Sequence, residues 1–166
     1  SHLKTGAPAF DTPPVFTYAV GADKWQRHDR FPAGETVNLY LDDRFSLSLA
    51  APAAKAAHDD YVSDPAHPVP FVPVPVDVRN RAVWSSWLVS DQRHASVRPD
   101  VVTYVSQPLK APLQIHGQPQ ANLFASTSGT DSDWVVKLID VHPEENSAQP
   151  ELAGLQLGIG MEIFRG

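Results

Sequence analysis

The stretch from Leu155 to Ile163, which reads LQLGIGMEI, carries an apolar residue at every second position. A period of two is that of a β-strand, in which alternate side chains point to the same face of a sheet. The pattern therefore predicts a strand with five large apolar side chains on one face. The stretch is long for a strand, and its two glycines, Gly158 and Gly160, indicate a β-bulge.

Working outward from this stretch, shorter runs of similar character recur along the chain. Runs that predict a strand lie at 15–20, 37–41, 45–49, 101–106, 113–116, 121–127 and 134–141. The second and third runs are joined by Asp42-Asp43, which suits a tight turn, so these two strands predict a hairpin. Many short strands separated by turn residues predict an all-β protein, as a sandwich, jelly roll or barrel.

The prolines support the all-β prediction. The 166 residues include 16 prolines, and proline interrupts helices because it has no N–H to donate. The alanine-rich segment 50–60 contains Pro52, so we predict a loop there rather than a helix. Five prolines between 65 and 75 predict an extended, polyproline-like crossing.

Composition narrows the classes of partner. The formal net charge is −6 and no basic run stands out, so nucleic acid is not expected as a partner. No apolar run approaches the roughly 18 residues of a membrane helix, so we predict no membrane partner. The chain has no cysteine, which excludes disulfides and cysteine-bearing zinc sites. No cofactor is expected.

Catalytic machinery is not apparent in the sequence. A serine hydrolase typically places its nucleophile in a Gly-x-Ser-x-Gly turn, and this chain has no such motif. Ser126, Ser128 and Ser132 lie in a loop rich in serine and threonine. No two histidines have the four-residue spacing of a helical zinc pair. The histidines are His2, His28, His58, His67, His94, His116 and His142.

The most acidic turn offers too few ligands for calcium. Asp131 and Asp133 are close in sequence, and Asp140 could join them only if the fold returned it. Calcium takes six to eight oxygen ligands. A turn in which the two aspartates accept hydrogen bonds from the backbone is the better interpretation, so we predict no metal site.

The four tryptophans are the other group with functional potential. Trp134 starts an apolar strand and is expected in the core. Trp25, Trp84 and Trp87 could stack on sugars, line an apolar pocket or anchor an interface. Trp84 and Trp87 lie outside any clear strand, which makes them the better candidates for a contact surface.

Several ordered stretches resemble motifs in the C-terminal domain of serine hydrolases of the X-prolyl dipeptidase, cocaine esterase and α-amino acid ester hydrolase kind. The resemblance covers nearly the whole chain, and its nearest subgroup is the α-amino acid ester hydrolases, which are similar to glutaryl acylases. The stretches that carry it are 14–25, 61–71 (YVSDPAHPVPF), Asp91-Gln92-Arg93, 98–109 (RPDVVTYVSQPL), 117–125 and 131–143 (DSDWVVKLIDVHP).

This resemblance implies a domain organisation. Such enzymes have an α/β-hydrolase domain, a helical cap and a C-terminal jelly roll, and their catalytic residues precede the jelly roll. We therefore expect residues 1–14 to be a linker from an upstream hydrolase domain and 15–166 to be a jelly-roll-like β-sandwich. Because the chain stops at Gly166, directly after its strongest strand, we expect the jelly roll to be incomplete. Relatives are often periplasmic or secreted.

The resemblance also implies a function. No catalytic residue is expected here, and the chain alone should not hydrolyse esters. The parent enzyme would hydrolyse esters, amides or X-Pro dipeptides. We expect the domain to pack on the hydrolase domain, with Trp84, Trp87 and Leu88 forming part of the substrate-pocket wall. Plain inter-domain packing is an equal alternative. A carbohydrate-binding module and an oligomerisation module are further alternatives, since open strand edges favour a homo-oligomer.

Overall fold

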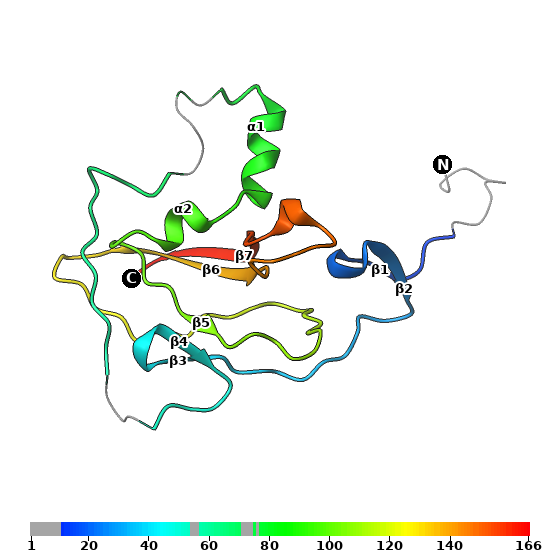
Figure 1. Cartoon of the computed structure of the whole chain (residues 1–166), viewed down its shortest axis with the longest axis horizontal. Helices are drawn as coiled ribbons and strands as arrows, with labels where there is room; N and C mark the ends of the chain where they lie inside the picture. Colours follow the sequence, from blue (N-terminus) through cyan, green and yellow to red (C-terminus); the bar gives the residue numbers. More distant parts are fainter. Residues whose placement is uncertain (1–10, 54–56, 71–74, 76) are drawn as a thin grey trace. The chain divides into compact units, whose positions relative to one another are not determined.

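The two longest strands lie where the sequence places its clearest patterns. In a computed structural model, which describes residues 11–53, 57–70, 75 and 77–166, β6 (Asp133–Val141) pairs antiparallel with β7 (Gln156–Arg165). Figure 1 shows the two strands side by side. At the open end of the pair, the Arg165 Nε donates to Asp133 Oδ1 at 2.7 Å. The strands predicted at 134–141 and 155–163 are therefore confirmed.

A bulge interrupts this ladder within β7. Leu138 pairs with Gly160, but the next residue of β6, Ile139, pairs with Gly158, so Ile159 is an extra residue. The two glycines flank the extra residue, as their weak packing in a regular strand leads one to expect. The predicted β-bulge is confirmed.

The bulge changes which side chains share a face. Lys137 pairs with Met161 and Asp140 pairs with Leu157. Paired residues share a face, and residues three apart on β6 lie on opposite faces. Met161 and Leu157 therefore lie on opposite faces of the sheet. The prediction that all five apolar residues of 155–163 share one face is wrong, because the extra residue shifts the alternation.

A second hairpin lies near the start of the chain. β1 (Val15–Ala19) pairs antiparallel with β2 (Lys24–His28) through the 3-10 turn η1 (Val20–Ala22). Asp23 closes the turn in the left-handed region, with φ of 49°, and its N–H donates to the Val20 carbonyl at 3.2 Å. The strand predicted at 15–20 is confirmed, whereas β2 was not recognised in the sequence.

The predicted central hairpin also forms, in a shorter version. β3 (Tyr40–Asp42) pairs antiparallel with β4 (Ser46–Ser48) around the turn η2 (Asp43–Phe45), and β4 pairs in parallel with β5 (Val105–Ser106). The Asp42 carboxylate accepts a hydrogen bond from the Asp43 N–H at 2.8 Å. Acidic residues therefore make the turn, as predicted.

Other predicted strands are absent. The segments 113–116 and 121–127 contain no strand, and only residues 105–106 of the run 101–106 are in one. A strand needs a neighbour to accept and donate its backbone hydrogen bonds, and these segments have none within the described residues. An alternating sequence does not by itself show whether a strand has a neighbouring strand to pair with.

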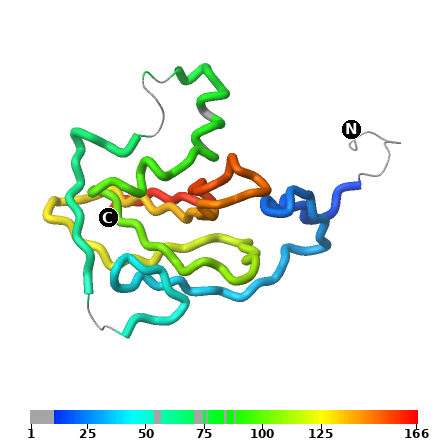
Figure 2. The backbone as a smooth tube through the Cα atoms, viewed as in Figure 1, coloured from blue at the N-terminus to red at the C-terminus, as the bar shows by residue number. Residues whose placement is uncertain are grey.

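In the part of the chain that the structure describes, helical structure is limited to short pieces. Besides the turns η1 and η2, they are α1 (Arg81–Ser86), the 3-10 turn η3 (Trp87–Val89), α2 (Arg93–Ser96) and the 3-10 turn η4 (Pro150–Leu152). Residues 50–53 and 57–60 contain no helix, as predicted. The protein is all-β in class, with small sheets joined by long connections, which Figure 2 traces along the backbone.

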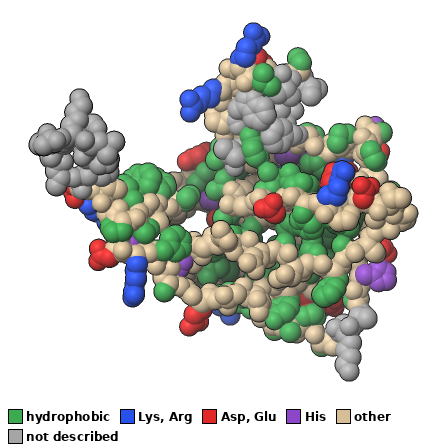
Figure 3. Space-filling view, turned by 180° about the vertical axis from the view of Figure 1, so that it is seen from behind, with side chains coloured by type: hydrophobic (Ala, Val, Ile, Leu, Met, Phe, Trp, Pro, Cys, Tyr) green, Lys and Arg blue, Asp and Glu red, His purple; other side chains and the backbone are tan. Residues whose placement is uncertain are grey.

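Among the described residues, burial is very limited. The buried residues there are Ala95 and Gln92, each 7% exposed, and Gly154, while many large apolar side chains are exposed. They include Trp25, Phe45, Val135 and Ile163. Hydrophobic side chains are visible in several places on the face drawn in Figure 3. Trp134 is half-buried rather than fully buried, so its predicted core position is met only in part.

The chain divides into two compact units. One comprises 1–38 with 112–117, and the other comprises 39–111 with 118–166. The first unit contains β1 and β2, and the second contains the other strands and the helices. The predicted boundary between a linker and the sandwich at residue 14 stays a prediction, because residues 1–10 lie outside the described residues. In the described part of the chain, no helix is long and apolar enough to span a membrane.

Candidate functional site

The tryptophan segment predicted as a pocket wall forms one continuous helical piece. Trp84 lies in α1, and Trp87 and Leu88 lie in the turn η3 that follows directly. Trp87 is half-buried. The side chains of Trp84 and Leu88 lie outside the described part of the structure. The Ser90 N–H and the Ser90 hydroxyl both donate to the Trp87 carbonyl, at 3.3 and 2.9 Å, and this ends the helical segment.

Gln92 fastens this segment to the β6–β7 sheet. Its Nε2 donates to the Ser90 carbonyl at 2.8 Å, while its Oε1 accepts from Lys137 Nζ at 2.7 Å. The Gln92 N–H also donates to the Gln156 carbonyl of β7 at 3.0 Å. Gln92 is 7% exposed, and a buried amide stabilises a fold only when it is hydrogen-bonded in this way. Partial burial lowers the pKa of Lys137 below its ordinary value.

Asp91 and Arg93 complete the attachment on either side of Gln92. Asp91 Oδ1 accepts from the backbone N–H groups of Arg93 and Gln156, at 3.0 and 3.4 Å. Arg93 Nε donates to Asp91 Oδ2 at 2.6 Å. This hydrogen bond from Arg93 is the main cause that holds the pKa of Asp91 below its ordinary value. The sequence singled out Asp91-Gln92-Arg93 only by resemblance, and the structure gives these residues an anchoring role.

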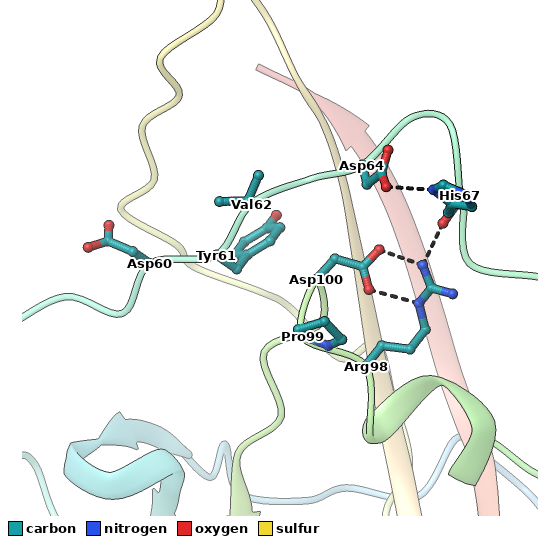
Figure 4. A pocket seen from close by; sticks show the side chains of 8 residues that line it. All are labelled: Asp60, Tyr61, Val62, Asp64, His67, Arg98, Pro99 and Asp100. Atoms are coloured by element: carbon teal, nitrogen blue, oxygen red, sulfur yellow. Dashed lines mark hydrogen bonds and ion pairs between the residues drawn. The ribbon is translucent and has the colours of Figure 1, made fainter.

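A surface pocket of about 550 Å³ lies elsewhere in the same unit. Figure 4 shows its lining, in which Arg98 lies between Asp100 and the carbonyl of His67. Arg98 Nε and Nη2 donate to the two oxygens of Asp100 at 2.7 and 2.6 Å, a bidentate ion pair. The lining residues are Asp60, Tyr61, Val62, Asp64, His67, Arg98, Pro99 and Asp100.

Arg98 joins two loops that are distant in sequence. Its Nη2 also donates to the His67 carbonyl at 2.5 Å, across 31 residues. Tyr104 reinforces the junction by donating from its hydroxyl to Asp59 Oδ2 at 2.5 Å. Burial, followed by the hydrogen bond to Asp59, raises the pKa of Tyr104 to about 12. The pocket wall is therefore held by side chains from both loops.

The pocket was missed as a site by sequence reasoning. Its two loops belong to 61–71 and 98–109, which are among the stretches that carry the family resemblance. The available signal was that one stretch carrying the family resemblance places an arginine and an aspartate, Arg98 and Asp100, two residues apart. A spacing of two residues lets one loop side chain bind the other. The sequence could not show that the His67 carbonyl also accepts a hydrogen bond from Arg98.

The histidine and carboxylate side chains of the described residues do not gather into a metal site. No group of three or more histidine, aspartate or glutamate side chains there could hold a metal ion. Asp131 and Asp133 instead both lie close to Arg165, with a closest ion-pair distance of 3.6 Å for Asp131. The hydroxyl–histidine pair in the described part joins Thr17 Oγ1 to His28 Nε2 at 3.0 Å, across the β1–β2 hairpin.

Comparison with known proteins gives a consistent result. The family described as the X-Pro dipeptidyl-peptidase C-terminal non-catalytic domain matches residues 8–163. Cocaine esterase of Rhodococcus sp. (strain MB1 Bresler) is 30% identical over 155 residues, which cover 86% of this chain and 26% of that protein. This agrees with the resemblance found in the sequence.

Two solved structures share both fold and sequence. An α-amino acid ester hydrolase matches with a TM-score of 0.83 and 50% identity, over 97% of this chain and 28% of that one. An aminopeptidase from the marine sediment archaeon Thaumarchaeota archaeon matches with a TM-score of 0.88 and 48% identity, over 96% and 27%. The chain spans about a quarter of the length of these relatives. It belongs to the family of X-Pro dipeptidyl-peptidase C-terminal non-catalytic domains.

Proposed function

We propose that this domain packs on the α/β-hydrolase domain of the same polypeptide and helps to shape its substrate pocket. The observation that carries the proposal is the imbalance of burial. Among the described residues, three are buried (Gln92, Ala95 and Gly154), while apolar side chains as large as Trp25 and Phe45 are 60% and 52% exposed. Apolar surface of this kind is stabilised by contact with another protein surface.

The relatives indicate what the partner surface is. They are named as an esterase, an ester hydrolase and an aminopeptidase, and each is about four times longer than the part matched here. The matched family is non-catalytic and C-terminal. The remaining part of such a protein, which precedes the domain, is therefore the partner that we propose.

In the proposed enzyme, the reaction is acyl transfer by a serine of the hydrolase domain. That serine attacks the ester or amide carbonyl, a histidine takes its proton, and backbone N–H groups stabilise the oxyanion. This chain contributes none of these groups in the proposal. Its contribution is an apolar wall that excludes water and selects the size of the acyl or side-chain group.

The segment that we assign to the wall contains Trp84, Trp87 and Leu88. It is well suited to a fixed wall because Gln92 ties its end at Ser90 to Lys137 of β6. A pocket wall discriminates between substrates only if its side chains keep their positions, since a flexible wall adapts to either substrate. The anchoring by Gln92 therefore supports a positioning role for this segment.

The test is Trp87→Ala in the full-length enzyme. We expect the ratio of kcat/KM for a substrate with a bulky acyl group to that for a small one to change by about tenfold, because removing the indole enlarges the pocket. The melting temperature of the enzyme should stay unchanged. The ratio is measured with paired chromogenic esters, and melting by differential scanning fluorimetry.

Val89→Ala is the matched control, since Val89 lies in the same turn and is 64% exposed. It should leave both readings unchanged. A lower melting temperature of Trp87→Ala, without a change in the ratio of kcat/KM values, would indicate plain inter-domain packing and remove the pocket role. An unchanged ratio together with unchanged melting would remove both roles for Trp87.

A further inference from the structure

A chain of hydrogen bonds leads from β6 to the end of the helical segment that contains Trp87. Lys137 Nζ donates to Gln92 Oε1 at 2.7 Å. Gln92 Nε2 donates to the Ser90 carbonyl at 2.8 Å and to the Ser90 hydroxyl oxygen at 3.3 Å. The Ser90 hydroxyl donates in turn to the Trp87 carbonyl at 2.9 Å. We call these four residues the relay, and all of them lie in the same compact unit.

The hydrogen bonds of the relay all run in one direction, because Lys137 begins it. An ammonium group has three donors and no acceptor, so the oxygen of the Gln92 amide must face it. The amide nitrogen then faces Ser90 and donates to its carbonyl and its hydroxyl oxygen. This leaves the hydrogen of the Ser90 hydroxyl for the Trp87 carbonyl. The direction of the whole relay therefore depends on the charge of one side chain.

Lys137 loses its charge at a lower pH than an ordinary lysine does. Among the described residues, no charged neighbour shifts its pKa, and burial alone lowers it. The other charged or titratable groups on its face of the β6–β7 pair, and on the segment that bears Gln92, are engaged in hydrogen bonds of their own. They are Asp133, Arg165, Asp91, Arg93 and His94. Asp140 and Glu162 lie on the opposite face of the pair.

Loss of this charge changes which orientation of the Gln92 amide is allowed. A neutral amine has a lone pair and can accept a hydrogen bond, so the amide is no longer held in one orientation. When the amide turns over, its nitrogen faces Lys137 and its oxygen faces Ser90. The Ser90 hydroxyl then has a second acceptor, which competes with the Trp87 carbonyl for its hydrogen. The end of the helical segment is held less tightly in that state.

We propose that Lys137 is a positioning residue for the segment that contains Trp87, and that its positive charge fixes the position of this segment through the relay. The inference rests on the proposed function, in which Trp87 forms part of the substrate-pocket wall. It adds a regulation of the same site, because the selectivity of the wall then depends on pH.

The sign of the pH dependence follows from the ordinary pKa of lysine, which is about 10.4. Since the pKa of Lys137 is lowered, its titration falls below that figure. The ammonium form is therefore the main form at neutral pH, and the neutral form increases as the pH rises toward about 10. Selectivity is expected to be full at neutral pH and to decline at alkaline pH.

The test measures substrate selectivity of the full-length enzyme against pH. The ratio compares kcat/KM for a bulky ester with that for a small ester, and neither ester carries an ionisable group. Both esters use the same catalytic groups, so the titration of those groups cancels in the ratio. Between about pH 7 and about pH 10, we expect the ratio to shift by at least about threefold, in the direction that Trp87→Ala shifts it. A ratio that stays constant over this range would overturn the proposal.

Three variants assign the shift to Lys137. Lys137→Arg keeps a donor-only cation that stays charged to about pH 12, so its ratio should match that of the wild type at neutral pH and stay constant. Lys137→Met removes the charge but keeps a long side chain opposite Met161, so its ratio should be independent of pH and shifted already at neutral pH. Lys110→Met, at an exposed lysine, is the matched control and should keep the wild-type profile. A pH-dependent ratio in Lys137→Met would assign the titration to another group and defeat the proposal.

Hydrogen exchange at Ser90 reports on the relay without any substrate. The Ser90 N–H donates to the Trp87 carbonyl at 3.3 Å, so its exchange rate at a fixed neutral pH measures how tightly the end of the segment is held. We expect Lys137→Met to exchange at least about threefold faster there than the wild type, and Lys137→Arg to exchange at the wild-type rate. Equal rates in the three proteins would contradict the relay.

The two measurements separate this inference from the proposed function. A ratio altered by Trp87→Ala but not by Lys137→Met would remove the positioning role and leave the pocket wall in place. A ratio altered by neither variant would remove the pocket wall, and the regulation of its selectivity with it. A ratio altered by both, together with faster exchange at Ser90 in Lys137→Met, is the result that supports the proposal.

Discussion

The β6–β7 pair and the β1–β2 hairpin are both antiparallel, and both arise from alternating sequence, but they use the alternation differently. In β6–β7 the bulge at Ile159 divides the apolar residues between two faces, and Gln92 anchors the pair to a helical segment. In β1–β2 the register is unbroken, and the aromatic residues lie together on the exposed face. The same sequence signal thus accompanies opposite patterns of burial.

This difference shows what alternation can reveal. A period of two establishes that neighbouring side chains lie on opposite faces of a strand. It does not establish which face is covered, because that depends on what packs against the sheet. At β6–β7, the contact of Gln92 with Lys137 shows what packs against the pair. The predictions below test whether the two pairs differ in this respect.

The largest effect is expected from Gln92→Ala. It removes three side-chain hydrogen bonds, to the Ser90 carbonyl, the Ser90 hydroxyl and Lys137, from a buried position. We expect β6–β7 to lose about 2 kcal/mol of opening free energy, since the Ser90 carbonyl then lacks its partner. Hydrogen–deuterium exchange of peptides covering 133–141 and 156–165, in the full-length protein, measures this loss.

Gln120→Ala is the matched control, because Gln120 is exposed, and it should leave exchange of the same peptides unchanged. The β1–β2 peptides should be unaffected by Gln92→Ala, since their cross-strand bond joins Thr17 to His28. Equal loss of protection in both pairs would contradict the comparison, because it would show that the two unfold as one unit.

A smaller effect is expected at the glycines of the two connections. Gly154, which precedes β7, has a φ of +66°, and an added Cβ would lie 2.8 Å from Glu144 Oε2. Gly21, in the turn of the β1–β2 hairpin, has open space around it. We expect Gly154→Ala to cost about 1 kcal/mol and Gly21→Ala to be close to neutral. Chemical unfolding of the two variants, followed by exchange of the nearby peptides, measures the difference.

The outcomes that would contradict this are specific. A neutral Gly154→Ala would show that Glu144 moves aside and that the left-handed conformation is not required. A destabilising Gly21→Ala would show that the turn is covered in the full-length protein.

Much of the fold was predictable because local signals and pairing agree. The strands at 15–20 and 134–141 combine β-branched and aromatic residues, and Asp42-Asp43 provides turn chemistry for the hairpin that follows. The segments 113–116 and 121–127 have similar alternation but no strand, because pairing is a non-local property. The division of the β7 side chains between two faces could not be predicted from the sequence either, because it depends on the register with β6.

The candidate site was predictable only in part, for the same reason. Trp84, Trp87 and Leu88 were selected by residue type, and their assignment to a pocket wall stays a prediction. The contact of Arg98 with the His67 carbonyl joins residues 31 positions apart, and the contact of Lys137 with Gln92 spans 45. Neither contact leaves a local trace in the sequence. Motif resemblance indicated these residues, but their roles required the structure.

The smallest effect is expected in the acid dependence of β6–β7. Asp91 has a pKa below its ordinary value, chiefly through the hydrogen bond from Arg93. A depressed carboxyl pKa stabilises the folded state above the ordinary value near 4, and this stabilisation is lost as the pH falls through the lowered value. We therefore expect exchange protection of residues 156–165 to fall as the pH drops below about 4. Asp91→Asn should flatten this dependence while lowering protection at neutral pH.

The acid dependence has other contributors, which the variants must separate. Arg98 and Arg165 similarly lower the pKa of Asp100 and Asp133 through hydrogen bonds, so some acid sensitivity remains in Asp91→Asn. Arg93→Gln removes the cause but retains the carboxylate, and it should flatten the dependence as Asp91→Asn does. If Asp91→Asn flattens it and Arg93→Gln does not, the backbone N–H groups of Arg93 and Gln156 hold the carboxylate instead. The anchor of β7 would then rest on backbone contacts, and the role of the Arg93 side chain would be lost.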